Sequence, residues 1–265
     1  MQTILKNSKV DISCIYVNYH SVQFLENSLK SLFEWEKDNS YEVIIVNSDA
    51  SEEKSVALLA EKFQAKVISA FHNPGFGAAV NLGALQAEGE ILFFVNPDTQ
   101  WQESFFENAL QVMKKEIRIG ALGIQMASLN GMPEKQNCGR SLSCKSFFTP
   151  KNLFRKELDW VGGGALFVSQ EAFLTVGGFD EHFFLYFEDM DFCVRLKQLG
   201  FSIAQDTAHT LIHHGGKSHA NKKIQKKYYD QSMYKYAKKH WSFWEYMTFR
   251  LLHPLYRFFY PYGRN

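Results

Sequence analysis

Four short apolar segments alternate with amphipathic segments within the first hundred residues. The apolar segments are 11–17, 41–46, 66–70 and 90–95. Continuous apolar runs of this length are typical of strands buried on both faces, and their alternation with helices indicates a parallel sheet covered by helices. We therefore expect an α/β domain whose ligands bind beyond the carboxyl ends of the strands.

Apolar residues at helical spacing predict two helices between the first three of these strands. A glycine-rich loop over 72–77 opens a further short helix at Ala78. The residues that define the first two helices are Leu25, Leu29, Leu32 and Phe33, followed by Val56, Leu59 and Phe63.

The regular alternation stops after about residue 118. Residues 119–127 and 160–169 are predicted strands, and 170–179 is predicted as a short helix ended by glycine. The stretch 129–158 is polar and without a clear period, as expected of a surface or lid loop.

Composition and cysteine usage limit the class of protein. With 265 residues, of which 46% are hydrophobic, the chain can form one large domain or a domain with an appendage. No signal-peptide pattern and no run of transmembrane length is visible, so a cytoplasmic location is expected. No C-x-x-C pair occurs, which predicts buried thiols in a reducing compartment for Cys14, Cys138, Cys144 and Cys193.

The net charge of +1 conceals an acidic body and a basic tail. Residues 1–216 contain 18 basic and 26 acidic side chains, whereas residues 217–265 contain 11 basic and 2 acidic ones. The tail could pack on the domain as a helix, bind nucleic acid or lie on an anionic membrane. The acidic body and the lack of a recognition module disfavour nucleic acid. Basic residues beside aromatic ones suit a membrane surface, so we expect a partly packed, partly membrane-facing helix. Its apolar stripe is Tyr229, Met233, Tyr236, His240, Trp244, Met247 and Leu251.

Polar and acidic groups follow two of the predicted strands. The second strand ends in "VNSDAS" and the fourth in "VNPDTQ". Asn, Asp, Ser and Pro are also the ordinary residues of turns, so each group alone is equally compatible with turn chemistry. No G-x-G-x-x-G follows the first strand and no Walker loop is present, which disfavours a nucleotide-dependent dehydrogenase and a P-loop enzyme.

Three carboxylates stand directly behind an aromatic run. Glu188, Asp189 and Asp191 follow "FFLYF" over 183–187, and apolar positions after them predict a helix that ends near Gly200. Acids in the first turn favour the positive end of a helix dipole. An aromatic surface beside carboxylates also suits a sugar site.

An ordered set of seven motifs resembles the inverting family 2 glycosyltransferases, nearest to the rhamnosyltransferase-like branch. The motifs cover roughly residues 10–219, and "GGFDEHFFLYFEDMD" is the most diagnostic of them. The other six are "VNYHS", "EVIIVNSDAS", "NPGFGAAVNLG", "FFVNPDT", "WVGGGALFVSQEAF" and "IHHGGKS".

The resemblance implies a GT-A fold, which is a Rossmann-like, mostly parallel central sheet flanked by helices. A nucleotide-sugar half is expected over about 1–118 and an acceptor half over about 119–219. A C-terminal helical extension, basic and aromatic, is expected over 220–265 as a membrane-surface segment.

The resemblance also implies a nucleoside-diphosphate sugar donor. Asn47 stands where the family has an aspartate that reads the nucleobase. An amide can both accept from and donate to an imide edge, and Asp49 is near enough to substitute. The donor-binding residues implied are Val17, Asn18, Tyr19, Asn47, Asp49, Asn73, Gly75, Phe76, Gly77, Asn81, Asn96, Pro97 and Asp98.

A divalent metal, Mg²⁺ or Mn²⁺, is implied by the same resemblance. Asp98 matches the acid that ligates the metal at the donor pyrophosphate, and a hard cation takes carboxylate and phosphate oxygens. Asn96 replaces the first acid of the usual D-x-D motif, which weakens metal binding without abolishing it. His213, preferred over His214, matches a histidine near the metal.

The pair Glu188 and Asp189 matches the family's "ED" motif. Asp189 is implied as the general base that takes the proton from the acceptor hydroxyl, with Glu188 beside it. At a helix N-terminus its carboxylate is expected to be ionised and only weakly basic. Asp191 is expected to be mainly structural. The acceptor-binding residues implied are Trp160, Gly163, Gly164, Asp180 and Asp191.

The sequence thus predicts an inverting glycosyltransferase, with rhamnose from dTDP-rhamnose as the leading donor. The expected acceptor is a glycan or a lipid-linked glycan, reached from the inner face of the cell membrane by peripheral association. Two alternatives remain open at this stage. One is a non-catalytic nucleotide- or sugar-binding protein on a membrane, which the departures at Asn47 and Asn96 would allow. The other is a nucleotidyltransferase, which would not need the acceptor-side motif.

Overall fold

The computed structural model describes residues 10–70, 72–134, 138–143, 158–215 and 222–259. Cys144 and most of the predicted loop 129–158 lie outside these residues. The strands are β1 (Ile12–Asn18), β2 (Tyr41–Asn47), β3 (Lys66–Ser69), β4 (Ile91–Val95), β5 (Thr99–Gln100), β6 (Ile119–Ala127), β7 (Cys138–Gly139), β8 (Trp160–Val161), β9 (Ala165–Ser169) and β10 (Ser202–His213). The helices are α1 (Val22–Trp35), η1 (Ala50–Glu52), α2 (Glu53–Phe63), α3 (Phe76–Ala84), α4 (Phe106–Lys115), α6 (Gln170–Val176), α7 (Glu188–Gln198), α8 (Lys222–His240) and α9 (Phe243–Phe259).

Eight of the strands form one mixed, mostly parallel sheet in the order β3-β2-β1-β4-β9-β6-β10-β5. β3, β2, β1 and β4 run parallel to one another. β9 is antiparallel to both β4 and β6, β10 is parallel to β6, and β5 is antiparallel to the end of β10. This topology brings the turn after β4 beside the carboxyl end of β10.

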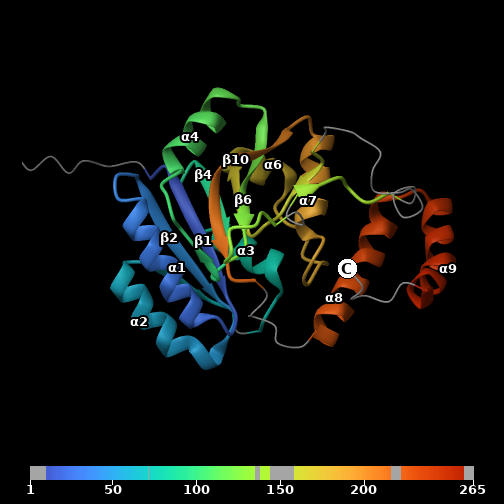
Figure 1. Cartoon of the computed structure of the whole chain (residues 1–265), viewed down its shortest axis with the longest axis horizontal. Helices are drawn as coiled ribbons and strands as arrows, with labels where there is room; N and C mark the ends of the chain where they lie inside the picture. The colour runs from blue at the N-terminus through green and yellow to red at the C-terminus, as the bar shows by residue number, and fades with distance from the viewer. Residues whose placement is uncertain (1–9, 71, 135–137, 144–157, 216–221, 260–265) are drawn as a thin grey trace, which may run out of the picture.

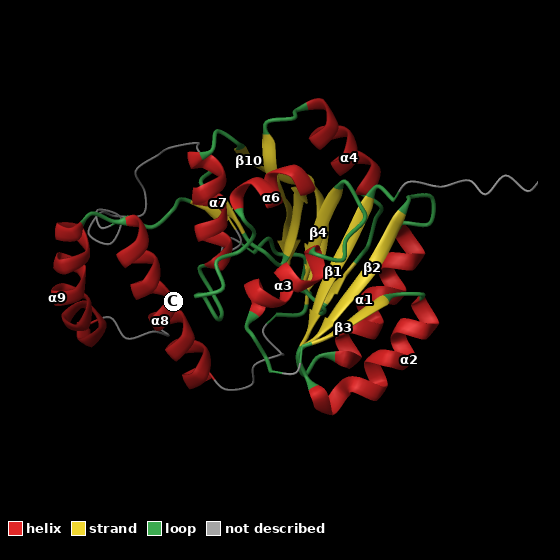
Figure 2. Ribbon diagram, turned by 180° about the vertical axis from the view of Figure 1, so that it is seen from behind, coloured by secondary structure: helices red, strands yellow, loops and turns green. Residues whose placement is uncertain are grey.

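Helices cover both faces of the sheet (Figures 1 and 2). The core on one face is formed with α1, α2 and α4, and the core on the other with α3, α6 and α7. β1 contributes Ile12, Cys14 and Tyr16 to the first core and Ile15 to the second, because successive side chains of a strand point to opposite faces.

The predicted elements are present with three differences. The strand predicted over 160–169 is divided into β8 and β9 by the glycines 162–164. β3 is an edge strand with mostly exposed side chains, so it is not buried on both faces as expected. The helix α4, whose Phe106, Ala109 and Met113 are buried, was not predicted.

The C-terminal helices pack on the body beside the aromatic run. Phe183, Phe187 and Met190 form a hydrophobic cluster with Met233 and Tyr236 of α8. In the described parts of the chain, no helix is both long enough and apolar enough to cross a membrane.

Candidate active site

The carboxyl end of β4 leads into a tight turn that carries Asn96, Pro97 and Asp98. The backbone N–H of Asn96 donates to the Gly164 carbonyl at 2.9 Å. The Asn96 amide packs so closely on Gly164 that an added Cβ would lie 2.9 Å from its Nδ2 atom. The Thr99 hydroxyl donates to the Asn96 carbonyl at 2.7 Å. The glycine segment 162–164 therefore lies directly against this turn.

Asp98 lies beside His213 because β5 pairs with the end of β10. His213 stands opposite Thr99 in that ladder, and the His214 N–H donates to the Asp98 carbonyl at 2.9 Å. The distance between His213 Nε2 and Asp98 Oδ1 is 3.2 Å. His214, by contrast, points its ring toward Phe24.

The other ring nitrogen of His213 faces a carboxylate that the sequence did not single out. His213 Nδ1 lies 3.1 Å from both oxygens of Glu134. Burial lowers the pKa of His213, but Asp98 and Glu134 together outweigh burial and raise this pKa to about 8. The imidazole is therefore held between two carboxylates in this structure.

Asp98 and His213 are the pair of side chains that could hold a divalent cation. Among the described residues, no group of three or more His, Cys, Asp or Glu side chains is arranged to hold a metal ion. A hard divalent cation accepts phosphate and water oxygens as its further ligands, so two protein ligands suffice beside a diphosphate. The oxygen and nitrogen donors fit Mg²⁺ or Mn²⁺, and the imidazole favours Mn²⁺.

Glu188 and Asp189 begin α7 directly after a strained turn. Tyr186 and Phe187 have φ angles of 68° and 69°, which are rare for bulky residues. The Gly163 N–H donates to Asp189 Oδ2 at 3.1 Å, and the Met190 N–H donates to Asp189 Oδ1 at 2.8 Å. The glycine segment 162–164 thus links Asp189 to the turn that carries Asp98.

Burial changes the acid strength of this pair. Burial raises the pKa of Glu188, and the neighbouring Asp189 charge raises it further. Burial also raises the pKa of Asp189, although hydrogen bonds from Gly163 and Met190 oppose the shift. Desolvation therefore outweighs the helix terminus and makes Asp189 more basic than an exposed aspartate. Glu188 Oε2 is buried and has no hydrogen-bond partner among the described residues.

The loop before α3 packs against Phe184, in the aromatic run that precedes α7. Asn73 Oδ1 accepts a hydrogen bond from the Gly75 N–H at 3.1 Å, and the Phe76 N–H donates to the Phe184 carbonyl at 3.0 Å. Gly75 has a φ of 93°, and an added Cβ would overlap the Phe184 carbonyl. Only glycine fits this close approach.

Two residues of α3, Gly77 and Asn81, complete that contact. Gly77 lies against Phe179, and a Cβ added to Gly163 would lie 3.1 Å from the Phe76 ring. The Asn81 amide donates to the Phe179 carbonyl at 2.9 Å and accepts from the Phe179 N–H at 2.9 Å. Asn81 therefore joins α3 to Phe179, and both ends of its side-chain amide are hydrogen-bonded in that contact.

The ends of β1 and β2 form a hydrogen-bonded network. Asn18 Nδ2 donates to Asn47 Oδ1 at 3.0 Å and to Glu52 at 2.9 Å. The Asn47 amide donates to the Asp49 carbonyl at 2.9 Å, and Asp49 caps η1 through Ser51. Asn47 and Asp49 thus fix the shape of this strand end, beside Val17 and Tyr19.

The Asp191 side chain is not accessible to a ligand. It is fully buried, and its carboxylate is paired with Arg195 at 2.7 Å, Lys239 at 2.7 Å and His240 at 2.7 Å. The prediction that Asp191 binds an acceptor is wrong, because its three partners and its complete burial leave no surface for a ligand. Asp180 is also paired with Lys239, at 2.6 Å.

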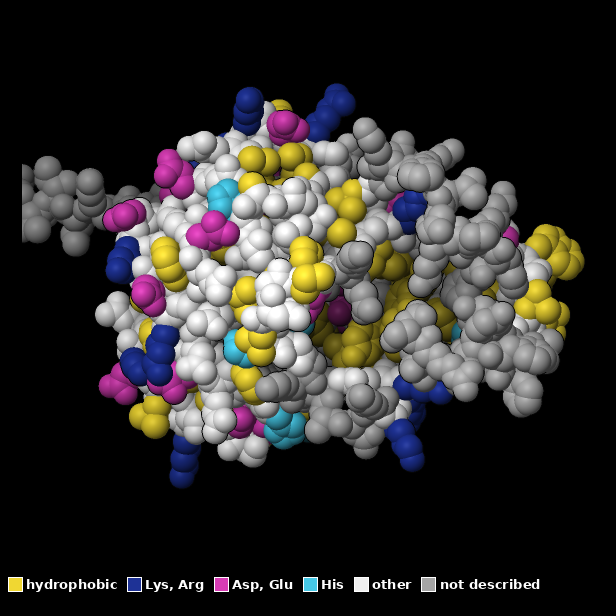
Figure 3. Space-filling model, viewed as in Figure 1, with side chains coloured by type: hydrophobic (Ala, Val, Ile, Leu, Met, Phe, Trp, Pro, Cys, Tyr) yellow, Lys and Arg dark blue, Asp and Glu magenta, His cyan; other side chains and the backbone are white. Residues whose placement is uncertain are grey.

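The aromatic run and Trp160 are largely committed to packing. Phe183 and Phe187 are buried against α8, whereas Phe184 and Tyr186 are half-buried against Tyr228 and Tyr229 of α8. Trp160 donates its indole N–H to the Arg140 carbonyl at 3.1 Å. The face of Figure 3 is hollowed near its centre, and acidic and hydrophobic side chains lie inside the hollow.

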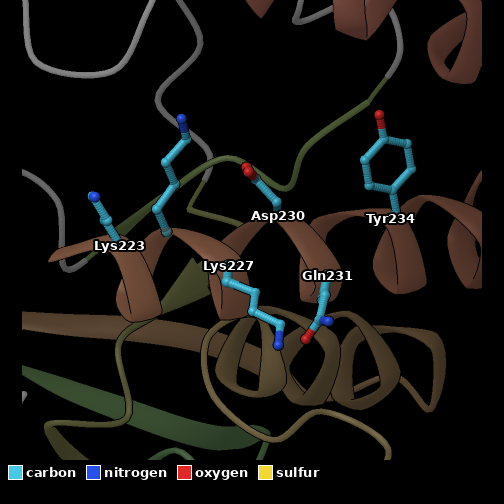
Figure 4. Close-up of a pocket in the computed structure, with 6 residues that line it drawn as sticks. Lys223, Lys227, Asp230, Gln231 and Tyr234 are labelled. Atoms are coloured by element: carbon cyan, nitrogen blue, oxygen red, sulfur yellow. The ribbon is translucent and has the colours of Figure 1, made fainter. Parts of the chain in front are cut away.

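The sequence missed three contributions to the site. Glu134 was assigned to a surface loop, the Phe184 carbonyl carries no side-chain signal, and Lys239 lies far from the acids it pairs with. None of these contacts follows from local spacing. A second hollow, of about 450 Å³, lies on α8 (Figure 4); it is lined by Lys223, Lys226, Lys227, Asp230, Gln231 and Tyr234.

Family models match most of the described body. The model described as "Glycosyl transferase family 2" matches residues 13–175. A second model, described as "N-terminal domain of galactosyltransferase", matches residues 146–215.

Curated relatives include sugar transferases from bacteria and archaea. An N-acetylglucosaminyl-diphospho-decaprenol L-rhamnosyltransferase of Mycobacterium tuberculosis is 26% identical over 231 residues, covering 76% of this chain and 75% of the relative. The low-salt glycan biosynthesis hexosyltransferase Agl10 of Haloferax volcanii is 22% identical, covering 77% and 67%. The rhamnosyltransferase WbbL of Escherichia coli is 37% identical over 57 residues, 22% of each chain.

Solved structures share the fold at low sequence identity. The mannosyltransferase PcManGT of Pyrobaculum calidifontis, in complex with GDP-Man and Mn²⁺, has a TM-score of 0.66 at 16% identity and covers 88% of this chain. TarS of S. aureus has a TM-score of 0.61 at 16% identity and covers 96% of this chain. This chain spans 64% and 44% of those two proteins, less than two thirds of either.

Proposed function

This chain belongs to glycosyl transferase family 2, has the GT-A fold and is a glycosyltransferase, and on that premise we propose its reaction. It transfers a hexose, with rhamnose from dTDP-rhamnose as the leading donor, to a glycan acceptor carried on a lipid. The transfer inverts the anomeric carbon. Two of the relatives are rhamnosyltransferases, and one of these two is named for a diphospho-decaprenol-linked sugar, which supports this choice.

Asp189 acts as the general base of this reaction. Its carboxylate takes the proton from the acceptor hydroxyl while that oxygen bonds to the anomeric carbon. The bond from that carbon to the donor phosphate oxygen breaks, and the nucleoside diphosphate leaves. A single displacement of this kind inverts the carbon. Because burial raises the pKa of Asp189, its carboxylate accepts a proton more readily than an exposed aspartate would.

Asp98 and His213 hold the divalent metal of the donor site. A bound Mg²⁺ or Mn²⁺ would neutralise charge on the leaving diphosphate. The facing side chains at 3.2 Å support this assignment. Asn96, which replaces an acid, packs on Gly164 and lines the approach to the site.

One observation carries the proposal more than any other. The glycine segment 162–164 contacts Asn96 on one side and Asp189 on the other. A donor diphosphate at Asp98 and an acceptor hydroxyl at Asp189 would therefore meet across three residues without side chains. Bulky residues there would separate the two substrates.

The reaction is tested by direct transfer. The protein is incubated with Mn²⁺, a polyprenyl-diphosphate-linked N-acetylglucosamine and, in parallel, dTDP-rhamnose, UDP-N-acetylglucosamine or GDP-mannose. We expect a product heavier by one deoxyhexose from dTDP-rhamnose, with an inverted anomeric centre by NMR. Transfer from another donor alone would overturn the sugar assignment. A retained anomeric configuration would overturn the role of Asp189.

The α9 helix supplies the surface that meets the membrane. Phe249 and His253 are buried against α8. Trp244 and Leu251 lie on the opposite face of α9, and Phe243 is its first residue; they have 77%, 69% and 66% of their surface exposed. Apolar and aromatic side chains on a basic helical pair suit the boundary of an anionic bilayer. Peripheral binding there would place the site near a lipid-linked acceptor.

A further inference from the structure

Glu134 lies at the end of a hairpin that returns the chain to β6. The Gly131 N–H donates to the Ser128 carbonyl at 2.8 Å, and the Glu134 N–H donates to the Met126 carbonyl at 2.8 Å. Ala127 and Pro133 form a bridge in the same hairpin. Because Ala127 pairs with Ile212 of β10, this hairpin brings Glu134 beside His213.

The geometry around His213 distinguishes its two nitrogens. Nε2 faces Asp98 at 3.2 Å, and Nδ1 faces both oxygens of Glu134 at 3.1 Å. A carboxylate at Nδ1 accepts the proton of that nitrogen, so the lone pair that can ligate a metal is at Nε2. The carboxylate also fixes the plane of the ring, which is half-buried.

We propose that Glu134 is a positioning residue for the metal site, which it serves by orienting His213. The inference rests on the proposed function, in which Asp98 and His213 hold the metal. Glu134 cannot be a ligand in this arrangement, because the imidazole ring stands between it and Asp98. It adds a negative charge behind the ligand and sets its tautomer. Such partners of metal-bound histidines typically change metal affinity about 10- to 100-fold when removed.

The test measures Mn²⁺ binding directly, through the loss of the free Mn²⁺ signal in electron paramagnetic resonance. The titration is done on the full-length protein with dTDP and with UDP. We expect Glu134→Gln, which keeps the shape and removes the charge, to weaken Mn²⁺ binding about tenfold or more. Glu134→Asp should retain part of the affinity, since it keeps the carboxylate.

Glu103→Gln is the matched control for the lost charge. Glu103, between β5 and α4, accepts a hydrogen bond from the Thr210 N–H of β10 at 2.8 Å, so its carboxylate contacts the strand that carries His213 but is bonded to a different residue of it. We expect its Mn²⁺ affinity to equal that of the parent. Equal losses of Mn²⁺ affinity in Glu103→Gln and Glu134→Gln would overturn the inference. They would show that the loss comes from removing any nearby negative charge, not from the contact with His213.

A double-mutant cycle separates an action through His213 from a direct one. With His213→Gln in place, adding Glu134→Gln should cause no further loss of Mn²⁺ binding; additive losses would contradict the proposal. Parent-like Mn²⁺ binding by Glu134→Gln, beside weakened binding by Asp98→Asn and His213→Gln, would overturn the role of Glu134 alone. Unchanged binding in all of these variants would overturn the metal site itself.

Discussion

The Asp189 carboxylate accepts a hydrogen bond from the backbone N–H of Gly163, with 3.1 Å between the two atoms. This contact joins the start of α7 to the glycine segment 162–164, which in turn lies against the turn after β4. It fixes one oxygen of Asp189, the proposed general base, beside the glycine segment that lies against the proposed donor site. The predictions below follow from this arrangement and from the way the rest of the chain supports it.

Asp189→Asn should abolish transfer while leaving donor binding intact. The amide keeps the shape of the carboxylate but cannot take the proton, and loss of a general base costs about 10² to 10⁴ in rate. Turnover is measured with the working donor, and nucleotide affinity by calorimetry. A variant with parent-like turnover would move the base to another residue.

The pH dependence of kcat/KM should show an acid limb above the ordinary aspartate pKa of 3.8. Burial raises the pKa of Asp189, so the base is protonated and inactive below that raised value and becomes competent as pH rises through it. The profile is recorded with saturating Mn²⁺ and low donor. Full activity down to pH 4 would contradict the raised pKa.

Gly75→Ala should disrupt the contact between the loop before α3 and Phe184, in the aromatic run that precedes α7. The added Cβ would overlap the Phe184 carbonyl, and the φ of 93° already disfavours alanine. We expect a loss of more than about 2 kcal/mol in the free energy of unfolding, above the ~1 kcal/mol of backbone strain alone. Gly131→Ala is the control, since its φ is 76° but nothing lies within 4 Å of its Cβ position. Equal costs for both would show that the contact contributes nothing.

Asp191→Asn should destabilise the fold more than it lowers turnover. It leaves Arg195, Lys239 and His240 without their buried anion, and breaking such a group costs about 3 kcal/mol, near the low end because Lys239 is partly solvated. Chemical denaturation gives the stability, and the transfer assay gives the rate. A folded but inactive variant would place Asp191 in the chemistry.

Acid should remove part of the stability that Asp180 and Asp191 provide. Burial raises the pKa of both carboxyl groups. Lys239 and His182 at Asp180, and His240, Lys239 and Arg195 at Asp191, outweigh burial through hydrogen bonds and charge, so both pKa values are lowered in the folded state. The contribution is therefore complete above the unfolded-state pKa of about 3.9 and is lost as pH falls through the folded-state values. Unfolding curves from pH 6 to pH 3 should show a steeper loss for the parent than for Asp191→Asn.

Replacing Phe243 and Trp244 by serine should weaken binding to anionic vesicles. We expect a loss of about tenfold or more, equivalent to ~1.4 kcal/mol, and a weaker interaction in raised salt. Leu85→Ser is the control, because Leu85 is similarly exposed, at 74%, on the body of the protein. Equal co-sedimentation of all three proteins would exclude α9 as the membrane surface.

The sequence predicted the elements that local patterns determine. The apolar segments before Asn18, Asn47 and Asn96 became buried parallel strands, and the family and fold expected from the motifs are confirmed. Such segments are decided by hydrophobic periodicity and by residues adjacent in sequence.

The parts that could not be predicted depend on contacts between distant segments. Glu134 meets His213 across 79 positions, and Lys239 meets Asp180 across 59. The acid strength of Asp189 likewise depends on burial that only the folded chain creates. Asp191 was expected to be mainly structural, but its partners on α8 could not be identified from spacing.

The pairing of Asp191 with α8 has a consequence for the order of synthesis. His240 follows Asp191 by 49 positions, which at translation rates of about 5–20 residues per second is a delay of roughly 2–10 s. Of the three partners of Asp191 among the described residues, only Arg195, four residues away, is then already present beside the anion in the first turn of α7. The nascent chain therefore carries an incompletely compensated charge two residues from Asp189, the proposed general base. Sugar transfer should begin only after α8 has emerged and docked, so that the growing polypeptide does not consume donor before it can reach its acceptor.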